Sequence, residues 1–221
     1  MGIQVKICGI TSAEAADAAV QAGADYAGLV FHSRSPRYLW LDAAASLANR
    51  MRGRASLVAL LCDAGDEQIA TVIRAVHPDM LQLHGSESPA RVGAIRAQFG
   101  LPVMKALPIA EAADFAGISE YEKAADMLLF DAKPASDAAR TGGYGVAFDW
   151  QLLRGRKFSR PWLLAGGLHG ENVRRAIQTS DAPGVDASSG VETAPGLKSP
   201  ELIRAFVAAA RNAHFVTEQQ S

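Results

Sequence analysis

Residues 5–30 read VKICGITSAEAADAAVQAGADYAGLV, and this stretch contains the unit from which the whole chain is built. An apolar run at residues 5–8 is followed by an alanine-rich amphipathic segment and then by a second apolar run at residues 26–30. Continuous apolar runs are typical of parallel strands covered on both faces, and the segment between them has helical periodicity. Residues 5–30 therefore predict a strand, a helix and a second, parallel strand.

The same pattern continues to the end of the chain. Further strand-like runs lie at residues 57–61, 80–83, 103–107, 127–130, 162–165 and 185–187. Every run except the sixth is followed by a clear helical pattern. Eight such repeats close most economically as a barrel, so the sequence predicts an α/β fold, a single (β/α)8 barrel spanning residues 1–221 as one domain.

Local signals mark the ends of some elements. Thr11 with Glu14 predicts a capping box for the first helix, and Ser199-Pro200 predicts the N-cap and first turn of the last one. Residues 132–147 are rich in Gly, Pro and small polar side chains and lack a helical period. We expect a long loop there, after the sixth strand, that covers the active face.

Composition limits the function classes. The chain has 221 residues, 49% of them apolar, and a net charge of −1 with acidic and basic residues intermixed. No basic face indicates nucleic acid, and no apolar stretch indicates a membrane or a secretory signal. The two cysteines, Cys8 and Cys62, favour a reducing compartment. We expect a cytoplasmic protein, a monomer or weak homodimer, whose partner is a small molecule.

In a barrel of this kind the active site lies at the carboxyl ends of the strands, where Cys8 and Asp131 each end an apolar run. Cys8 is either a small buried hydrophobe or a reactive thiol, and the helix that begins soon after it is expected to lower its pKa. Asp131 is either a loop anchor or a general acid. As an acid at neutral pH it needs surroundings that favour its protonated form.

Other polar side chains at the strand ends allow two interpretations each. His84 is a core-edge histidine or a positioning residue, and Arg37 is a surface charge or a clamp for a carboxylate. Lys6 points to the same side of its strand as Cys8 by alternation, and its role stays open. Cys62 is interpreted as a core filler.

Two small-residue loops follow the seventh and eighth strands, where barrels commonly bind phosphate through backbone N–H groups and a short helix. The alternative is that both are merely tight turns. Because the two loops occur together at the two expected strands, we predict a sugar-phosphate site. Its residues are Gly166, Gly167, Ser188, Ser189 and Gly190.

The chain resembles the phosphoribosylanthranilate isomerase family over nearly its whole length. The resemblance is carried by KICGIT (6–11), GADYAGLVF (23–31), SPRY (35–38), LQLHG (81–85), LLFDAK (128–133), GGYGVAFDW (142–150), LAGGLHGENV (164–173) and VDASSGVETAPGLK (185–198). The sequence departs from the family pattern at Tyr144 and Val146, in the loop after the sixth strand, and at Cys62.

The resemblance implies an Amadori rearrangement of N-(5-phosphoribosyl)anthranilate in tryptophan biosynthesis, with Cys8 as base and Asp131 as acid. It places Arg37 on the anthranilate carboxylate, Asp186 near the bridging amine, and the two small-residue loops on the phosphate. His84, from its place at a strand end, is a further candidate substrate-binding residue. The resemblance implies no metal and no organic cofactor, because the substrate nitrogen is the electron sink.

Three alternatives remain at the level of sequence. Indole-glycerol-phosphate synthase would use a lysine such as Lys6 as its acid, and a pentose-phosphate epimerase would need His and Asp metal ligands, of which only His84 ends a strand. A non-catalytic sugar-phosphate binder would keep the loops, but it would have no need for Cys8 and Asp131.

Overall fold

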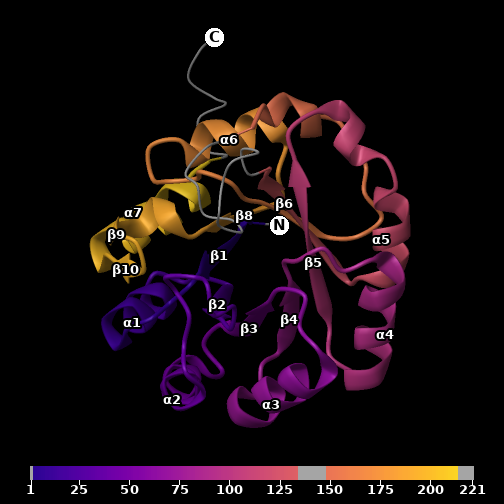
Figure 1. Cartoon of the computed structure of the whole chain (residues 1–221). Coiled ribbons are helices and arrows are strands. Elements are labelled where there is room, and N and C mark those ends of the chain that lie inside the picture. The colour runs from indigo at the N-terminus through magenta and orange to yellow at the C-terminus, as the bar shows by residue number, and fades with distance from the viewer. Residues whose placement is uncertain (1, 134–147, 214–221) are drawn as a thin grey trace.

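Eight parallel strands close into a barrel in their order along the chain, β1 to β8, as the sequence predicts. The computed structural model describes residues 2–133 and 148–213. Figure 1 shows the strands at the centre and the helices around them. The strands are β1 Gln4–Cys8, β2 Tyr26–Val30, β3 Ser56–Leu61, β4 Met80–Leu83, β5 Val103–Ile109, β6 Met127–Ala132, β7 Trp162–Leu164 and β8 Gly184–Ala187.

Helices follow the strands as the amphipathic segments indicate. They are α1 Ala13–Gln21, α2 Leu41–Met51, α3 Asp66–Val76, α4 Pro89–Phe99, α5 Ile118–Ala124, α6 Val173–Ser180 and α7 Pro200–Arg211, with short 3-10 turns η1 Ala112–Phe115, η2 Trp150–Leu153 and η3 Ser189–Val191. None of the described helices is long and apolar enough to cross a bilayer.

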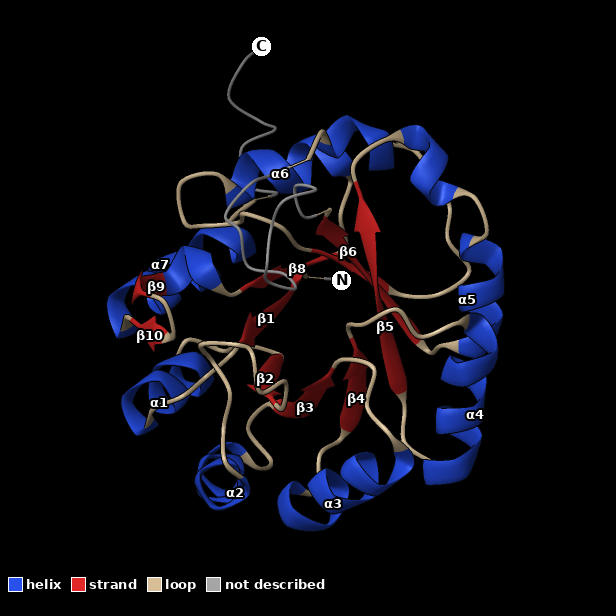
Figure 2. Ribbon diagram, viewed as in Figure 1, coloured by secondary structure: helices blue, strands red, loops and turns tan. Residues whose placement is uncertain are grey.

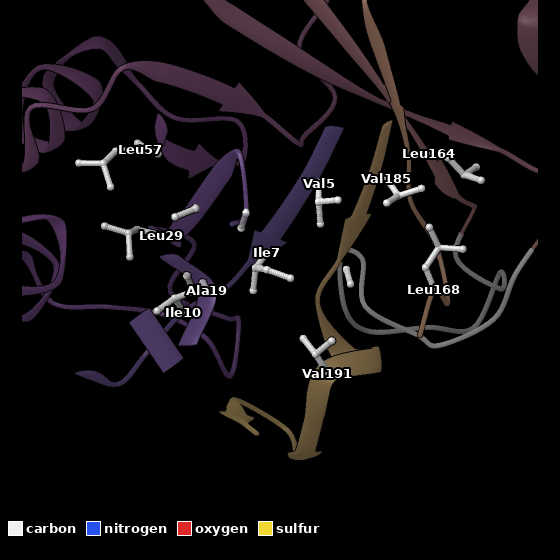
Figure 3. Packing of buried hydrophobic residues seen from close by; sticks show 14 of the residues in the cluster. Val5, Ile7, Ile10, Ala19, Leu29, Leu57, Leu164, Leu168, Val185 and Val191 are labelled. Carbon is white, nitrogen blue, oxygen red and sulfur yellow. The ribbon is translucent and has the colours of Figure 1, made fainter. Parts of the chain in front are cut away.

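Side chains on each strand alternate between an outer core against the helices and the interior of the barrel. Val5 and Ile7 on β1 point outward and pack with residues such as Val185 of β8 between the sheet and the helices (Figure 3). The inward positions of β5, β6 and β7 form a smaller apolar core that includes Met104, and Lys6 also takes an inward position. The two cores explain why the strand sequences are apolar on both faces.

The first helix begins differently from the prediction. Ser12, not Thr11, is its N-cap, because the Ser12 side chain accepts from the Ala15 N–H at 3.2 Å. The Thr11 hydroxyl instead donates to the Gly196 carbonyl at 2.7 Å, which ties the β1 loop to a distant turn. The predicted Ser199-Pro200 start of the last helix is confirmed by the Ser199 cap on Leu202 N–H.

A small hairpin, β9 Glu192–Ala194 with β10 Leu197–Lys198, was not anticipated from the sequence. It follows β8 in the chain and lies outside the barrel, beside α7 (Figure 2). Residues 134–147 lie outside the described residues. The expected loop over the active face therefore stays a prediction, as does any effect of Tyr144 and Val146, which lie in this segment.

Candidate active site

A cavity opens at the carboxyl ends of the strands. Its place is the one where barrel enzymes hold their active sites. The predicted site residues on its wall are Cys8, Arg37, His84, Asp131, Gly166, Gly167, Asp186, Ser188 and Ser189. Gly190 is the one predicted site residue that does not line the cavity, and it lies behind the wall.

Cys8 and Asp131 come from β1 and β6, which are separated in the closed barrel by β7 and β8. Both side chains nevertheless line the same cavity. Each occupies an inward position at the end of its strand, as alternation requires. The structure therefore brings together the two side chains that the sequence singles out as base and acid.

The surroundings of Cys8 differ from the expectation. Burial raises the pKa of its thiol above the ordinary value, and the Lys6 ammonium acts in the opposite direction. The neighbouring N–H groups of Gly9 and Ile10 donate to the Gly28 carbonyl at 2.9 and 3.0 Å, and α1 begins only at Ala13. The predicted lowering by the helix terminus is therefore wrong, because desolvation dominates and the neighbouring N–H groups are already used.

The ambiguity of Lys6 is resolved by an ion pair inside the barrel. Lys6 is fully buried, and its Nζ lies 3.0 Å from Asp186 Oδ1 on the paired position of β8. Burial alone would lower the pKa of Lys6, but Asp186 and Cys8 raise it above the ordinary value. Lys6 is not part of the cavity wall, which argues against it as the acid of a synthase.

Asp131 is held by His84, which follows β4, and by the backbone of its own strand. Its Oδ2 lies 3.2 Å from His84 Nε2, and its Oδ1 accepts from the Ala132 N–H at 2.8 Å. A Cβ atom at Gly166 would lie 2.6 Å from the Ala132 nitrogen, so only glycine fits beside the acid. His84 is thus a positioning residue for Asp131 as well as a wall residue. Its Nδ1 lies 2.9 Å from the Gln82 amide nitrogen.

Arg37 points inward, and one edge of its guanidinium is occupied. Its Nε and Nη2 donate to Glu192 at 2.6 and 2.8 Å, and Lys198 lies 2.8 Å from the same carboxylate. Although burial opposes it, bonds from Arg37 and Lys198 hold the pKa of Glu192 below its usual range. The edge of the guanidinium formed by Nη1 and Nη2 does not face Glu192. Two N–H groups on that edge can donate to the two oxygens of a carboxylate.

The sequence analysis missed Glu192 and Lys198, although both lie within a motif that it quoted. The signal that could have identified them is the presence of two oppositely charged residues in a loop that otherwise consists mostly of small residues. Arg37, the shared carboxylate's other partner, is 155 positions from Glu192, and nothing local indicates that contact.

The two small-residue loops lie side by side on the cavity wall. Gly166 and Gly167 adopt positive φ angles of 87° and 64°, which favour glycine. A Cβ atom at Gly190 would overlap the Leu168 carbonyl, so the β7 and β8 loops can pack this closely only with glycine there. Asn172 braces the first loop, donating to the Gly167 carbonyl and accepting from the His169 N–H, both at 2.9 Å.

Cys62 is half-buried and packs against the buried cluster of Cys8, Val30 and Leu60, as the core-filler interpretation expects, but it also lies on the cavity wall. Burial raises the pKa of its thiol to about 12. Within residues 2–133 and 148–213, no three His, Cys, Asp or Glu side chains gather in a way that could hold a metal ion.

A parallel barrel with polar side chains converging at its carboxyl end defines the chain as a (β/α)8-barrel enzyme. A family model described as N-(5′-phosphoribosyl)anthranilate (PRA) isomerase matches residues 5–209. The chain belongs to this family.

Individual relatives agree with the family model. The chain is 55% identical to the N-(5′-phosphoribosyl)anthranilate isomerase of Rhodopseudomonas palustris strain BisA53 over 96% of this chain and 97% of that one. It is 53% identical to that of Azorhizobium caulinodans, covering 96% and 93%. The phosphoribosyl anthranilate isomerase structure from Thermotoga maritima superimposes with a TM-score of 0.84 at 32% identity, covering 95% of this chain and 99% of that one.

Proposed function

We propose that the chain catalyses the Amadori rearrangement of N-(5′-phosphoribosyl)anthranilate to 1-(2-carboxyphenylamino)-1-deoxyribulose 5-phosphate, a step of tryptophan biosynthesis. The observation that carries this proposal is that Cys8 and Asp131 line one cavity from well-separated strands. A thiol and a carboxyl group that face one cavity can act on two atoms of one substrate. One acid and one base are what the rearrangement requires.

In the proposed mechanism Asp131 donates a proton to the furanose ring oxygen, and the C1–O bond breaks as the bridging nitrogen supplies its lone pair. The resulting iminium acidifies the hydrogen on C2. The Cys8 thiolate removes that proton, and the electron pair of the C–H bond forms the enolamine, which then relaxes to the ketone. The substrate nitrogen is the electron sink, so the chemistry calls for no metal or organic cofactor.

The wall of the cavity offers a complementary partner for each end of the substrate. Arg37, held by Glu192, is proposed to bind the anthranilate carboxylate, and Asp186 to lie near the bridging amine. The loops after β7 and β8 are proposed to bind the phosphate, with Gly166, Gly167, Ser188 and Ser189 on the wall and Gly190 behind it. The proposed partner is therefore a small phosphorylated molecule.

A bound complex of a relative supports the proposal. A phosphoribosyl anthranilate isomerase crystallised with reduced 1-(o-carboxyphenylamino)-1-deoxyribulose 5-phosphate superimposes on this chain with a TM-score of 0.80 at 31% identity. A biosynthetic reaction on a phosphorylated metabolite also supports the proposed cytoplasmic location.

The test is to add purified protein to N-(5′-phosphoribosyl)anthranilate and to follow the loss of substrate fluorescence, with the product identified by mass. We expect an isomeric product of unchanged mass. No conversion of this compound, together with formation of indole-glycerol phosphate and carbon dioxide when 1-(2-carboxyphenylamino)-1-deoxyribulose 5-phosphate is supplied, would show a synthase instead. Binding without any conversion would show a protein that only holds sugar phosphates.

A further inference from the structure

Gln82 is a fully buried polar side chain inside the barrel, on β4. Its amide nitrogen lies 2.9 Å from His84 Nδ1, whereas its Oε1 is buried and has no hydrogen-bond partner among the described residues. A buried oxygen without a partner costs folding free energy. Met104 and Leu129 line the neighbouring apolar interior, where an apolar side chain would avoid that cost.

The bond to Gln82 determines which nitrogen of His84 carries the proton. An amide NH2 group can only donate, so Nδ1 must accept and the ring proton lies on Nε2. Nε2 faces Asp131 at 3.2 Å, and there its N–H donates to a carboxylate. This orientation of the Gln82 amide therefore suits the His84–Asp131 pair in the state that lacks the proton Asp131 would donate.

A different arrangement is required before that proton is given. When the His84–Asp131 pair holds one more proton, His84 Nδ1 carries a hydrogen, and the extra proton is shared between Nε2 and the carboxylate. Nδ1 then needs an acceptor. The Gln82 amide supplies one if it turns by half a rotation, which brings the otherwise unpartnered Oε1 to Nδ1.

We propose that Gln82 is a positioning residue that partners His84 in both protonation states of the His84–Asp131 pair, by donating from its amide nitrogen in one state and accepting on its amide oxygen in the other. The loss of the proton to substrate and its return are then accompanied by a turn of one side chain. Use of this proton in catalysis rests on the function proposed above, whereas the switch of partner does not.

Other charged or titratable side chains surround the His84–Asp131 pair. They are the same in the wild type and in the Gln82 variants compared below. They are Lys6 and Cys8 on β1, His32 and Arg37 after β2, Cys62 after β3, Glu87 after β4, Lys105 on β5, and Asp186 on β8. Asp186 is electrostatically coupled to both His84 and Asp131. Lys105 is already bound by Glu87 and by the carbonyls of Leu83 and Gly85.

The first test compares pH profiles of kcat/KM for wild type, Gln82→Met and Gln82→Glu. Methionine can neither donate to nor accept from Nδ1, so both bonds are lost. Because the bond from a ring that carries the extra proton is the stronger of the two, the limb that reports the pair should move to lower pH, by up to about one unit. A carboxylate accepts permanently and should move the same limb to higher pH. Gln68→Met, which removes the amide that donates to the Phe31 carbonyl at 3.1 Å, should move neither limb.

The second test needs no isomerase activity, so it separates failure of this inference from failure of the proposed function. The imidazole signals of His84, assigned with a His84→Asn variant, are followed by NMR through a pH titration. The midpoint should fall in Gln82→Met and rise in Gln82→Glu. Unchanged midpoints in both folded variants would overturn the inference.

A melting experiment distinguishes this role from a structural one. Because Gln82→Met removes the unpartnered oxygen from an apolar interior, its melting temperature should equal or exceed that of the wild type. A much lower melting temperature together with an unshifted titration midpoint would make Gln82 a structural residue and contradict the proposal.

Discussion

Lys6 and Asp186 form an ion pair 3.0 Å long inside the barrel, with Cys8 two positions further along β1. Both partners are buried, and both influence the Cys8 thiol. Burial raises the pKa of that thiol, the Lys6 ammonium lowers it, and the Asp186 carboxylate raises it by less than Lys6 lowers it. The pair therefore has a net effect in favour of the thiolate, which is the form a base requires.

Replacing both members, Lys6→Met with Asp186→Asn, should raise the pH at which Cys8 becomes reactive by about one unit. The double variant avoids leaving one buried charge without its partner. The measurement is the pH dependence of alkylation by iodoacetamide in a Cys62→Ser background, so that Cys8 is the one thiol present. A midpoint that stays at the wild-type pH would show that Lys6 does not act on the thiol.

Arg37→Lys should raise KM about tenfold or more and change kcat much less. Lysine cannot present the two-pronged edge that Glu192 now orients, so binding of a planar carboxylate is weakened in the ground state and the transition state alike. Steady-state kinetics measures the split. The control is Arg204→Lys, an exposed arginine that pairs, within the described part of the chain, with Glu201 alone one turn away. An unchanged KM in Arg37→Lys would remove Arg37 from the substrate site.

Gly190→Ala should weaken phosphate binding about tenfold and destabilise the fold by about 1–3 kcal/mol, because the new methyl group overlaps the Leu168 carbonyl and separates the two loops. Inorganic phosphate as a competitive inhibitor reports the binding change. Gly93→Ala in α4 is the matched control, since a Cβ atom there meets its nearest neighbour at 4.0 Å. That control should gain about 0.5–1 kcal/mol of stability. Equal inhibition constants in the two variants would argue against the β7 and β8 loops as the phosphate site.

The barrel itself is predictable because each strand is buried on both faces and reads as one apolar run. The prediction is least accurate at the strand ends: β5 continues to Ile109 and β6 to Ala132, beyond the last residues of their apolar runs. Backbone pairing across the sheet, such as Pro108 with Asp131, determines these ends, and a single strand carries no sign of its partner's length.

The site is predictable as a set of positions but not as a set of contacts. Alternation along β1 and β6 places Cys8 and Asp131 inward, and the structure confirms that both reach one cavity. The Glu192 bond to Arg37 and the raised pKa of Cys8 depend on distant segments and on burial. The capping-box pattern favours Thr11, because Glu14 lies three residues later, whereas the actual cap Ser12 has Ala15 at that position and caps with its hydroxyl alone.

The most direct measurement is the turnover of Cys8→Ala and Asp131→Asn beside the wild type, with N-(5′-phosphoribosyl)anthranilate as substrate. Both groups act mainly in the transition state, so each variant should lose at least about a hundredfold in kcat. Each should still bind the reduced product analogue within about tenfold of wild type. Retention of more than a few per cent of the wild-type kcat by either variant would contradict its assigned role as base or acid.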